Sequence, residues 1–384
     1  MLIIHATIHT MAGDPVSDGF IRVEEGKIVQ VGETPPEGSG EEVVDVKGAD
    51  VYPGFVDAHT HLGMWEDSLT FEGDDGNEDT DPVTPQLRAI DAVNPLDRCF
   101  GEACAAGVTT VVTGPGSANP IGGQMAAMKT AGACIDKMIV KAPLAMKMAL
   151  GENPKSVYHG KSQAPTTRMA TAALIREELF KAKRYQKDLE LSRKDPDVDP
   201  PEYDIKCESL IPVLKREMQV HFHAHRADDI FTAMRIGREF GLDYVVIHAT
   251  DGHLIVNDLR EGHVPVLSGP FLCDRAKPEM KNLTPKSPGI LASGGVLTAI
   301  ITDHPVIPIQ YLPTCAALAV REGMSRGDAL RAITINPARI CGIDGRVGSI
   351  EPGKDADFTV FSADPLQMTS KPDMVFVLGK KVYG

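Results

Sequence analysis

Residues 53–63 read PGFVDAHTHLG, and they place His59 and His61 one residue apart at the end of a short apolar run. In an extended chain, successive side chains point to opposite faces, so both imidazoles are expected to project from the same side of a strand end. A histidine pair of this kind in a loop needs no function by itself. The positions of the other histidines therefore decide between an ordinary loop and a metal site.

Composition narrows the class of protein. The 384 residues are 42% hydrophobic, and no stretch approaches the ~18 apolar residues of a membrane span. The first residues, MLIIHATIHTMAGD, lack the basic start and apolar core of a signal peptide, so we expect a cytoplasmic protein. The formal net charge of −14 argues against nucleic acid as a partner, because phosphates attract basic surfaces. The seven cysteines include no CxxC pair, which predicts neither a disulfide framework nor a cysteine zinc site.

Both ends of the chain carry short runs of strand-forming residues. GFIRVEEGKIVQVGE lies near the start, and DADFTVFSAD and MVFVLGKKVYG lie near the end. Gly, Asp and Pro interrupt these runs, which is typical of small antiparallel strands. We predict that residues 1–53 and 350–384 form one small β-sandwich domain.

Residues 54–349 alternate apolar strands with amphipathic helices. The predicted strands include VTTVVTGPG, MQVHFHAH, YVVIHATDG and GVLTAIITDHP, and helical stretches such as DIFTAMRIGREFG separate them. Repeats of strand and helix indicate a parallel sheet with helical crossovers. The length of this region allows either an α/β barrel or a doubly wound sheet.

The remaining unusual histidines cluster at the C-terminal ends of the predicted strands. They are His221, His223 and His225 in VHFHAHR, His248 in YVVIHATDG, and His304 beside Asp303 in IITDHP. In a β/α barrel these strand ends form the active-site face, so ligands distant in sequence converge there. Imidazole and carboxylate groups suit a divalent ion such as zinc. We therefore predict an α/β fold with a (β/α)8 TIM-type barrel and a hydrolytic site in which metal-bound hydroxide attacks the substrate.

The order of these motifs resembles the metal-dependent amidohydrolase superfamily. PGFVDAHTHLG follows a β-rich N-terminus, single histidines follow on two later strands, and the tail reads NPARICGIDGRVGSIEPGKDADFTVFSADP. More narrowly, the chain is similar to the branch that contains imidazolonepropionase and prolidase-like hydrolases. The resemblance covers nearly the whole chain.

The resemblance implies a set of metal ligands, which are His59, His61, His223, His248 and Asp303. Related hydrolases bind metal through the first histidine of their HAH motif, and here that histidine is His223. His221 lies deeper in the strand and is expected either to belong to the core or to support a ligand from behind. His225 would lie beyond the metal, nearer the substrate.

Superfamily members with two metals also use a bridging acidic group, either a glutamate or a carboxylated lysine. The stretch APLAMKMALGENPKSVYHG offers both, as Glu152 and Lys147. We favour Glu152, because it falls at the strand-end turn where barrel ligands lie, and we keep carboxylated Lys147 as the alternative. The number of ions stays open at one or two, with zinc as the expected metal.

Substrate contacts are predicted in the loops that follow barrel strands. The candidates are His225, Arg226, Lys155, His159 and Gln124. For Lys155 and His159 taken singly, an ordinary polar loop is the simpler interpretation. Cys273 in SGPFLCDRAK is the one cysteine that we place near the site.

The expected metal ligands and substrate contacts together predict cleavage of the C–N bond of an amide or cyclic amide. Asp303 would take the proton of the attacking water and pass it to the leaving nitrogen, and His248 or His225 would stabilise the oxyanion. A lactonase or phosphotriesterase remains open, because hydroxide attacks ester carbon and phosphorus equally well. A non-catalytic assembly protein on the same scaffold is a further alternative. We expect a small-molecule substrate, no membrane partner, a homo-oligomer and no cofactor besides the metal.

Overall fold

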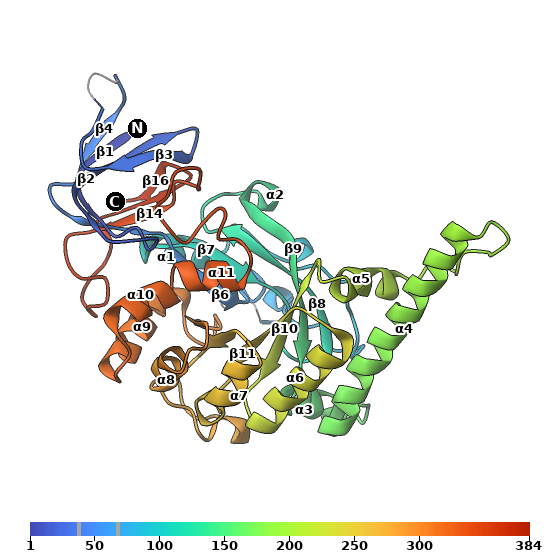
Figure 1. Cartoon of the computed structure of the whole chain (residues 1–384). Coiled ribbons are helices and arrows are strands. Elements are labelled where there is room, and N and C mark those ends of the chain that lie inside the picture. The colour runs from blue at the N-terminus through green and yellow to red at the C-terminus, as the bar shows by residue number, and fades with distance from the viewer. Residues whose placement is uncertain (37–39, 67–69) are drawn as a thin grey trace.

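The computed structural model describes residues 1–36, 40–66 and 70–384, and two eight-stranded sheets form its framework (Figure 1). The larger sheet is a nearly closed barrel whose strands follow one another in chain order. Its strands are β6 (Phe55–Thr60), β7 (Val108–Thr113), β8 (Ile121–Lys129), β9 (Ile139–Ala149), β10 (Gln219–Ala224), β11 (Tyr244–His248), β12 (Val266–Ser268) and β13 (Thr298–Ile300).

Strand β8 departs from the expected (β/α)8 pattern, because it runs antiparallel to both of its neighbours. The other neighbouring strands of the barrel sheet pair in parallel. Only residues 114–120 connect β7 to β8, and this connection is too short for the helical crossover that a parallel pair requires. The stretch that contains Gln124, expected to be a loop at the barrel mouth, is therefore mostly a strand.

Asp57 links the first and last strands of the barrel. Its carboxylate accepts hydrogen bonds from the backbone N–H and the hydroxyl of Thr302, at 3.0 and 2.6 Å. The backbone N–H of His61 donates to the carbonyl oxygen of His304 at 2.8 Å across the same junction. Burial raises the pKa of Asp57 to about 7, although the hydrogen bonds from Thr302 oppose that shift. The aspartate of the PGFVDAHTHLG motif therefore joins the two strand ends that carry site residues.

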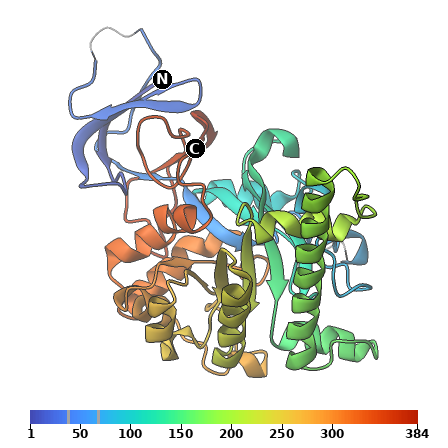
Figure 2. The same ribbon diagram turned by 45° about the vertical axis from the view of Figure 1, so that its right-hand side comes forward.

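Helices surround the barrel sheet, and the long helix α4 extends past it (Figures 1 and 2). Helix α6 is an example of how these helices pack against the sheet. Its buried residues recur at helical spacing and form one apolar face; they include Ile230, Ala233, Met234 and Gly237. None of the helices in the described part of the chain is both long and apolar enough for a membrane span. The helices are α1 (Arg98–Ala105), α2 (Ile135–Met138), α3 (Glu152–Gly160), α4 (Arg168–Lys194), α5 (Ile205–Leu214), α6 (Ala227–Phe240), α7 (Val256–Glu261), α8 (Ser287–Ser293), α9 (Leu312–Arg321), α10 (Arg326–Ala332) and α11 (Ile335–Ile340).

The second sheet combines strands from both ends of the chain, which lie together in Figures 1 and 2. Strand β14 pairs antiparallel with β5, so Phe358 lies opposite Pro53. The strands belong to one hydrogen-bonded sheet, and the expected two-layer sandwich and the boundaries at 53/54 and 349/350 remain proposals. The strands are β1 (Leu2–Ile8), β2 (Val16–Glu24), β3 (Lys27–Gly32), β4 (Val43–Asp45), β5 (Asp50–Pro53), β14 (Phe358–Phe361), β15 (Met374–Val377) and β16 (Lys380–Tyr383).

The tail motif GKDADF ties the terminal sheet to the barrel. The buried ammonium of Lys129, at the end of β8, lies 2.8 Å from the carboxylate of Asp355 and also pairs with Asp357. Asp355 further pairs with Lys27 at 2.6 Å and with Arg346 at 2.9 Å. The two acidic residues of this motif therefore hold the chain ends against the barrel.

Candidate metal centre

The two histidines of the PGFVDAHTHLG motif meet the carboxylate of Asp303. The Nε2 atoms of His59 and His61 lie 3.2 and 3.4 Å from the same oxygen, Oδ1 of Asp303. Nδ1 of His61 donates to the carbonyl oxygen of Gly114 at 2.7 Å. Because a carbonyl can only accept, the ring proton sits on Nδ1 and the Nε2 lone pair faces the site. We call His59, His61 and Asp303 the first donor group.

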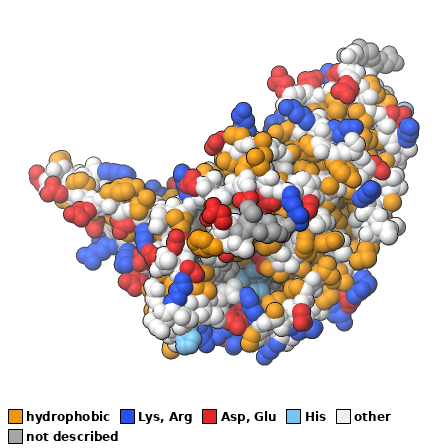
Figure 3. Space-filling model, turned by 180° about the vertical axis from the view of Figure 1, so that it is seen from behind, with side chains coloured by type: hydrophobic (Ala, Val, Ile, Leu, Met, Phe, Trp, Pro, Cys, Tyr) orange, Lys and Arg blue, Asp and Glu red, His pale blue; other side chains and the backbone are white. Residues whose placement is uncertain are grey.

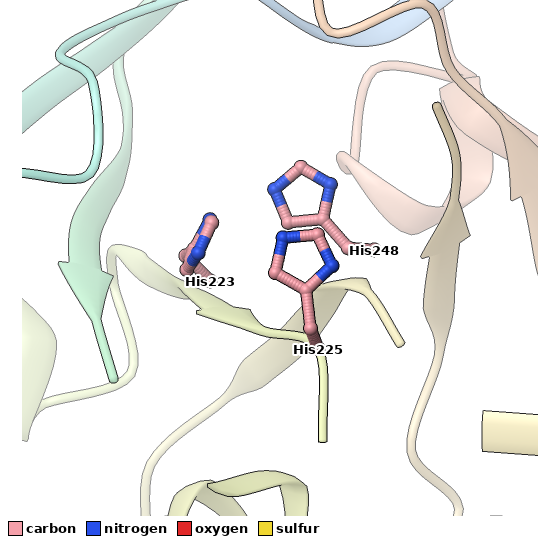
Figure 4. A group of neighbouring side chains, drawn as sticks. All are labelled: His223, His225 and His248. Atoms are coloured by element: carbon pink, nitrogen blue, oxygen red, sulfur yellow. The ribbon is translucent and has the colours of Figure 1, made fainter. Parts of the chain in front are cut away.

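A second donor group comes from β10 and β11. It consists of His223, His225 and His248, whose candidate ligand atoms lie within 4.8 Å of one another. Figure 4 shows the rings of His225 and His248 stacked, with His223 turned edge-on beside them; the stacked ring centroids are 4.4 Å apart. Nδ1 of His248 donates to the carbonyl oxygen of Gly269 at 2.7 Å, so its Nε2 lone pair is also free.

The two groups are neighbours at the C-terminal ends of the barrel strands. The ring centroids of His59 and His248 are 5.7 Å apart. His248 and Asp303 both adopt left-handed backbone conformations, with φ of 72° and 56°. Such conformations are strained for residues other than glycine, and they gather at functional sites. The placement agrees with the barrel-end rule on which the prediction from the sequence was based.

Lys147, on β9, lies directly beside the first donor group. Its side chain is fully buried, and Nζ is 3.2 Å from Nε2 of His59. Burial lowers the pKa of Lys147 to about 7, so a substantial fraction of the amine is uncharged at neutral pH.

Glu152, which we favoured as the bridging residue, belongs to neither donor group among the described residues. It begins helix α3, and its side-chain Oε2 accepts from the backbone N–H of Glu279 at 3.4 Å. Because the chain turns into a helix at this residue, its side chain no longer follows the direction of the strand. The geometry places Lys147, and not Glu152, next to the histidines.

Burial determines the charge state of the donors. It lowers the pKa of His59, His223 and His248 well below the usual range and that of His225 to about 4, so the rings are neutral. Burial alone would raise the pKa of Asp303, but the surrounding imidazoles of His248, His59 and His61 hold it well below the usual value. Neutral imidazoles and an ionised carboxylate are the forms that bind metal.

The residues present therefore fit a divalent transition metal. Each group offers donor atoms within 4.8 Å of one another, and backbone carbonyls fix the ring orientation of His61 and His248. Such hydrogen bonds to the outer ring nitrogen are usual for zinc-ligating histidines. Nδ1 of His59 and Oε1 of Glu279 are buried without a hydrogen-bond partner among the described residues, which indicates unused binding capacity at this place.

A cavity of about 530 Å³ opens over both groups. The face seen in Figure 3 is hollowed near its centre, and histidine side chains are visible inside the hollow. The lining includes His225, as predicted for a substrate contact, and Cys273, which we expected near the site. The lining also includes Trp65, Asn77, Ser117, Asn153 and Lys277, none of which was predicted as a site residue.

The other predicted substrate contacts lie outside this lining. Arg226 pairs with Asp228 through two hydrogen bonds of 2.9 and 2.8 Å, and Gln124 donates to the carbonyl oxygen of Pro85. Lys155 and His159 are exposed on α3. Helical periodicity explains their position, because α3 directs Asn153, Ser156 and Val157 into the cavity and turns Lys155 and His159 away. The cavity therefore supports His225 alone among these five candidates.

A barrel with one cluster of histidines and a carboxylate and a second cluster of histidines at its C-terminal strand ends is typical of metal-dependent hydrolases. Residues 51–382 match the amidohydrolase family, and the chain belongs to this family. Its members are metal-dependent hydrolases acting on C–N bonds, which confirms the resemblance drawn from the motifs.

Known proteins resemble the chain to different extents. It is similar to amidohydrolase tasK of Hapsidospora irregularis, with 31% identity over 94% of this chain, but it spans only 39% of that protein's length. An imidazolonepropionase of Thermoanaerobacter pseudethanolicus is 43% identical over 49 residues, 13% of this chain and 12% of that protein. The crystal structure of an amidohydrolase from Thermotoga maritima MSB8 is 44% identical, covers 100% of this chain and 99% of its own, and has a TM-score of 0.96.

Proposed function

We propose that this protein is a metal-dependent hydrolase that cleaves the C–N bond of a small amide or cyclic amide. The observation that carries the proposal is that buried Lys147 lies 3.2 Å from Nε2 of His59 and that one cavity opens over both donor groups. Membership in the amidohydrolase family supports the reaction class. The cavity volume of about 530 Å³ suits a small-molecule substrate.

His59, His61 and Asp303 would hold one ion, His223 and His248 a second, and carboxylated Lys147 would lie between them. The carboxylated lysine forms when the uncharged amine adds to carbon dioxide and loses a proton, and the lowered pKa of Lys147 favours that amine. Zinc is the metal that we expect from the histidine-rich donor set. When bound, the metal supplies Lewis acidity, which lowers the pKa of a bound water and polarises a substrate carbonyl.

Asp303 is the residue to which we assign proton transfer. It would accept one proton from the attacking water and return it to the nitrogen as the C–N bond breaks, so the products are an acid and an amine and the carboxylate is regenerated. Its position supports this role, because it lines the cavity and also contacts both histidines of the first group. Asp303 is thus available both to the substrate and to the metal. His248 fits a ligand better than an oxyanion donor, because its proton is held by Gly269.

A hydrolysis screen tests the proposal. The metal-loaded protein is offered N-acyl amino acids, dipeptides and cyclic amides, with esters and phosphotriesters as comparison substrates and the Asp303→Asn protein as the matched control. Metal-dependent release of amine from at least one amide, absent in the control, is the expected result. Turnover confined to esters or phosphotriesters would contradict C–N cleavage and favour the lactonase or phosphotriesterase alternative.

A further inference from the structure

Glu279 is a buried carboxylate to which no role has yet been assigned. It lies in the short helix η4 (Pro278–Met280), in the segment after β12, and is only 1% exposed. Its Oε1 atom lies 3.9 Å from Nε2 of His223 and 3.8 Å from Nε2 of His225. Within the described residues, Oε1 has no hydrogen-bond partner.

The backbone around Glu279 holds the carboxylate in place. The other carboxylate oxygen, Oε2, accepts from the backbone N–H of Glu152 at 2.9 Å. Gly151 has φ +87°, and a Cβ atom there would come within 2.8 Å of Oε2. A glycine is therefore needed for the carboxylate to approach this closely. Oε1 is left pointing at the two histidines.

Two other buried carboxylates have cationic partners. Asp355 pairs with Lys27, Lys129 and Arg346, and Asp229 pairs with Arg168 at 3.1 Å. In the part of the chain that the structure describes, the ion pairs of Glu279 involve only imidazoles. A buried charge without a counter-charge is costly, so a cation bound beside Oε1 would stabilise the Glu279 carboxylate.

The distances favour a metal ion as that cation. The separations of 3.8 and 3.9 Å are too long for hydrogen bonds. They are shorter than ~4.2 Å, the greatest distance between two ligands that each lie ~2.1 Å from one zinc ion. Nδ1 of His223 and Nδ1 of His225 are occupied by the hydroxyls of Ser117 and Thr250, at 2.9 and 2.7 Å. Nε2 of His223 has only a long contact of 3.5 Å from the side-chain amide of Asn153 among the described residues, so the Nε2 atoms of both rings are available to an ion.

We propose that Glu279 and His225 are metal ligands that join His223 at the ion of the second donor group. This inference rests on the proposed function, because it assumes that the protein binds a divalent metal. It goes beyond that function in one respect: the second ion has its own carboxylate and does not depend on carboxylation of Lys147. Each HxH motif then has a carboxylate of its own, Asp303 for the first and Glu279 for the second.

Zinc content and affinity test the proposal. The metal-free protein is titrated with Zn²⁺ against a chromophoric chelator, and bound zinc is measured by plasma mass spectrometry after gel filtration. The key variant is Glu279→Gln, which removes the charge but keeps an oxygen to accept the Glu152 N–H. Glu178→Gln is the matched control, because Glu178 is also buried but pairs with Lys181 on the surface of α4.

Two equivalents of zinc are expected in the parent protein and in Glu178→Gln. In Glu279→Gln, the affinity for one equivalent should fall by more than the ~10–100-fold that follows loss of an outer-sphere partner. His225→Asn should give the same loss if Glu279→Gln does not fold, and Lys147→Met should retain the ion of the second group. Circular dichroism checks the fold of each variant.

Two results would overturn the inference. Two equivalents bound with parental affinity in both Glu279→Gln and His225→Asn would show that these residues are not ligands. If Glu279→Gln keeps both ions but raises KM for amine-bearing substrates only, the carboxylate binds a substrate ammonium instead. Absence of zinc from the parent protein would contradict the proposed function itself, so the two failures are distinguishable.

Discussion

The motifs HTH at residues 59–61 and HAH at 223–225 have the same spacing and the same place at a strand end, but they lie in different surroundings. Both histidines of the first motif approach one oxygen of Asp303 within 3.4 Å. Both histidines of the second face one oxygen of Glu279 at 3.8 and 3.9 Å. Asp303 lines the open cavity, whereas Glu279 does not.

This difference separates two roles for a carboxylate. A carboxylate that contacts both metal ligands and the cavity can exchange protons with a substrate, and Asp303 is in that position. A fully buried carboxylate behind its histidines can hold an ion but has no access to the reacting bond, and Glu279 is in that position. The comparison therefore predicts that charge removal at the two residues has unlike effects on turnover and on metal content.

The largest effect is expected for Asp303→Asn. Asparagine keeps the size and one oxygen but cannot accept the proton of water, so kcat should fall by roughly 10²- to 10⁴-fold. Steady-state kinetics at saturating metal measure this fall, and plasma mass spectrometry confirms that the protein is loaded. Near-normal kcat in a fully loaded Asp303→Asn protein would leave the mechanism without its base.

Lys147→Met should mainly weaken the first donor group. The substitution removes the amine 3.2 Å from His59 and with it any carboxylated lysine, so zinc affinity at the first group should fall by at least ~10-fold. Glu152→Gln is the control, because the Glu152 side chain accepts a hydrogen bond from the backbone N–H of Glu279 and belongs to neither donor group among the described residues. Equal zinc loss in both variants, or loss only in Glu152→Gln, would restore the original preference for Glu152.

Gly151→Ala should destabilise the protein where the backbone at Gly151 approaches the carboxylate of Glu279. The added Cβ would meet Oε2 of Glu279 in a left-handed backbone conformation that alanine disfavours, and the free energy of unfolding should fall by roughly 1–3 kcal/mol. Urea denaturation of the metal-free protein measures this loss. Gly160→Ala, with open space around the glycine, is the matched control. Equal stability of the two variants would show that Glu279 does not need the close approach at Gly151.

The smallest effect is expected for the pH dependence of stability at Asp355, whose carboxylate pairs with cationic side chains of the protein. Burial alone would raise the pKa of Asp355, but the attraction and hydrogen bond of Lys129 lower it below its ordinary value. Because the folded pKa lies below the unfolded one, the stabilisation is present above about pH 4 and is lost as the pH falls through the folded pKa. The Tm of the parent protein should therefore drop more steeply below about pH 4 than that of Asp355→Asn. Parallel Tm curves would contradict this role.

The first donor group could be predicted almost entirely from the sequence. Alternation along a strand places His59 and His61 on one side, and the rule for barrel strand ends brings Asp303 to them across the sheet. The rule for strand ends also brought the histidines of VHFHAHR and His248 to this face, but the choice of His223 among them rested on the family resemblance. These predictions rest on local geometry and on a topology that the repeats of strand and helix already indicate.

The predictions that differ from the structure lie where the chain changes direction over a few residues. Glu152 was preferred to Lys147 because it falls at the strand-end turn, but Glu152 is the first residue of α3 and belongs to neither donor group among the described residues. Strand β8 was taken for a loop because its glycine-rich start resembled one. Glu279 gave no local signal, since a single glutamate in CDRAKPEM has neither spacing nor periodicity to mark it. Only the fold of the segment after β12 brings it to the histidines.

Metal removal and reconstitution test the central claim most directly. The protein is stripped with a chelator, assayed on the amide identified by the screen, then assayed again after addition of Zn²⁺, with His59→Ala/His61→Ala treated in parallel. Amide hydrolysis should disappear with the metal and return on reconstitution in the parent protein, but should not return in the double variant. Undiminished hydrolysis by the stripped protein, or full recovery by the double variant, would contradict a catalytic metal centre at these residues.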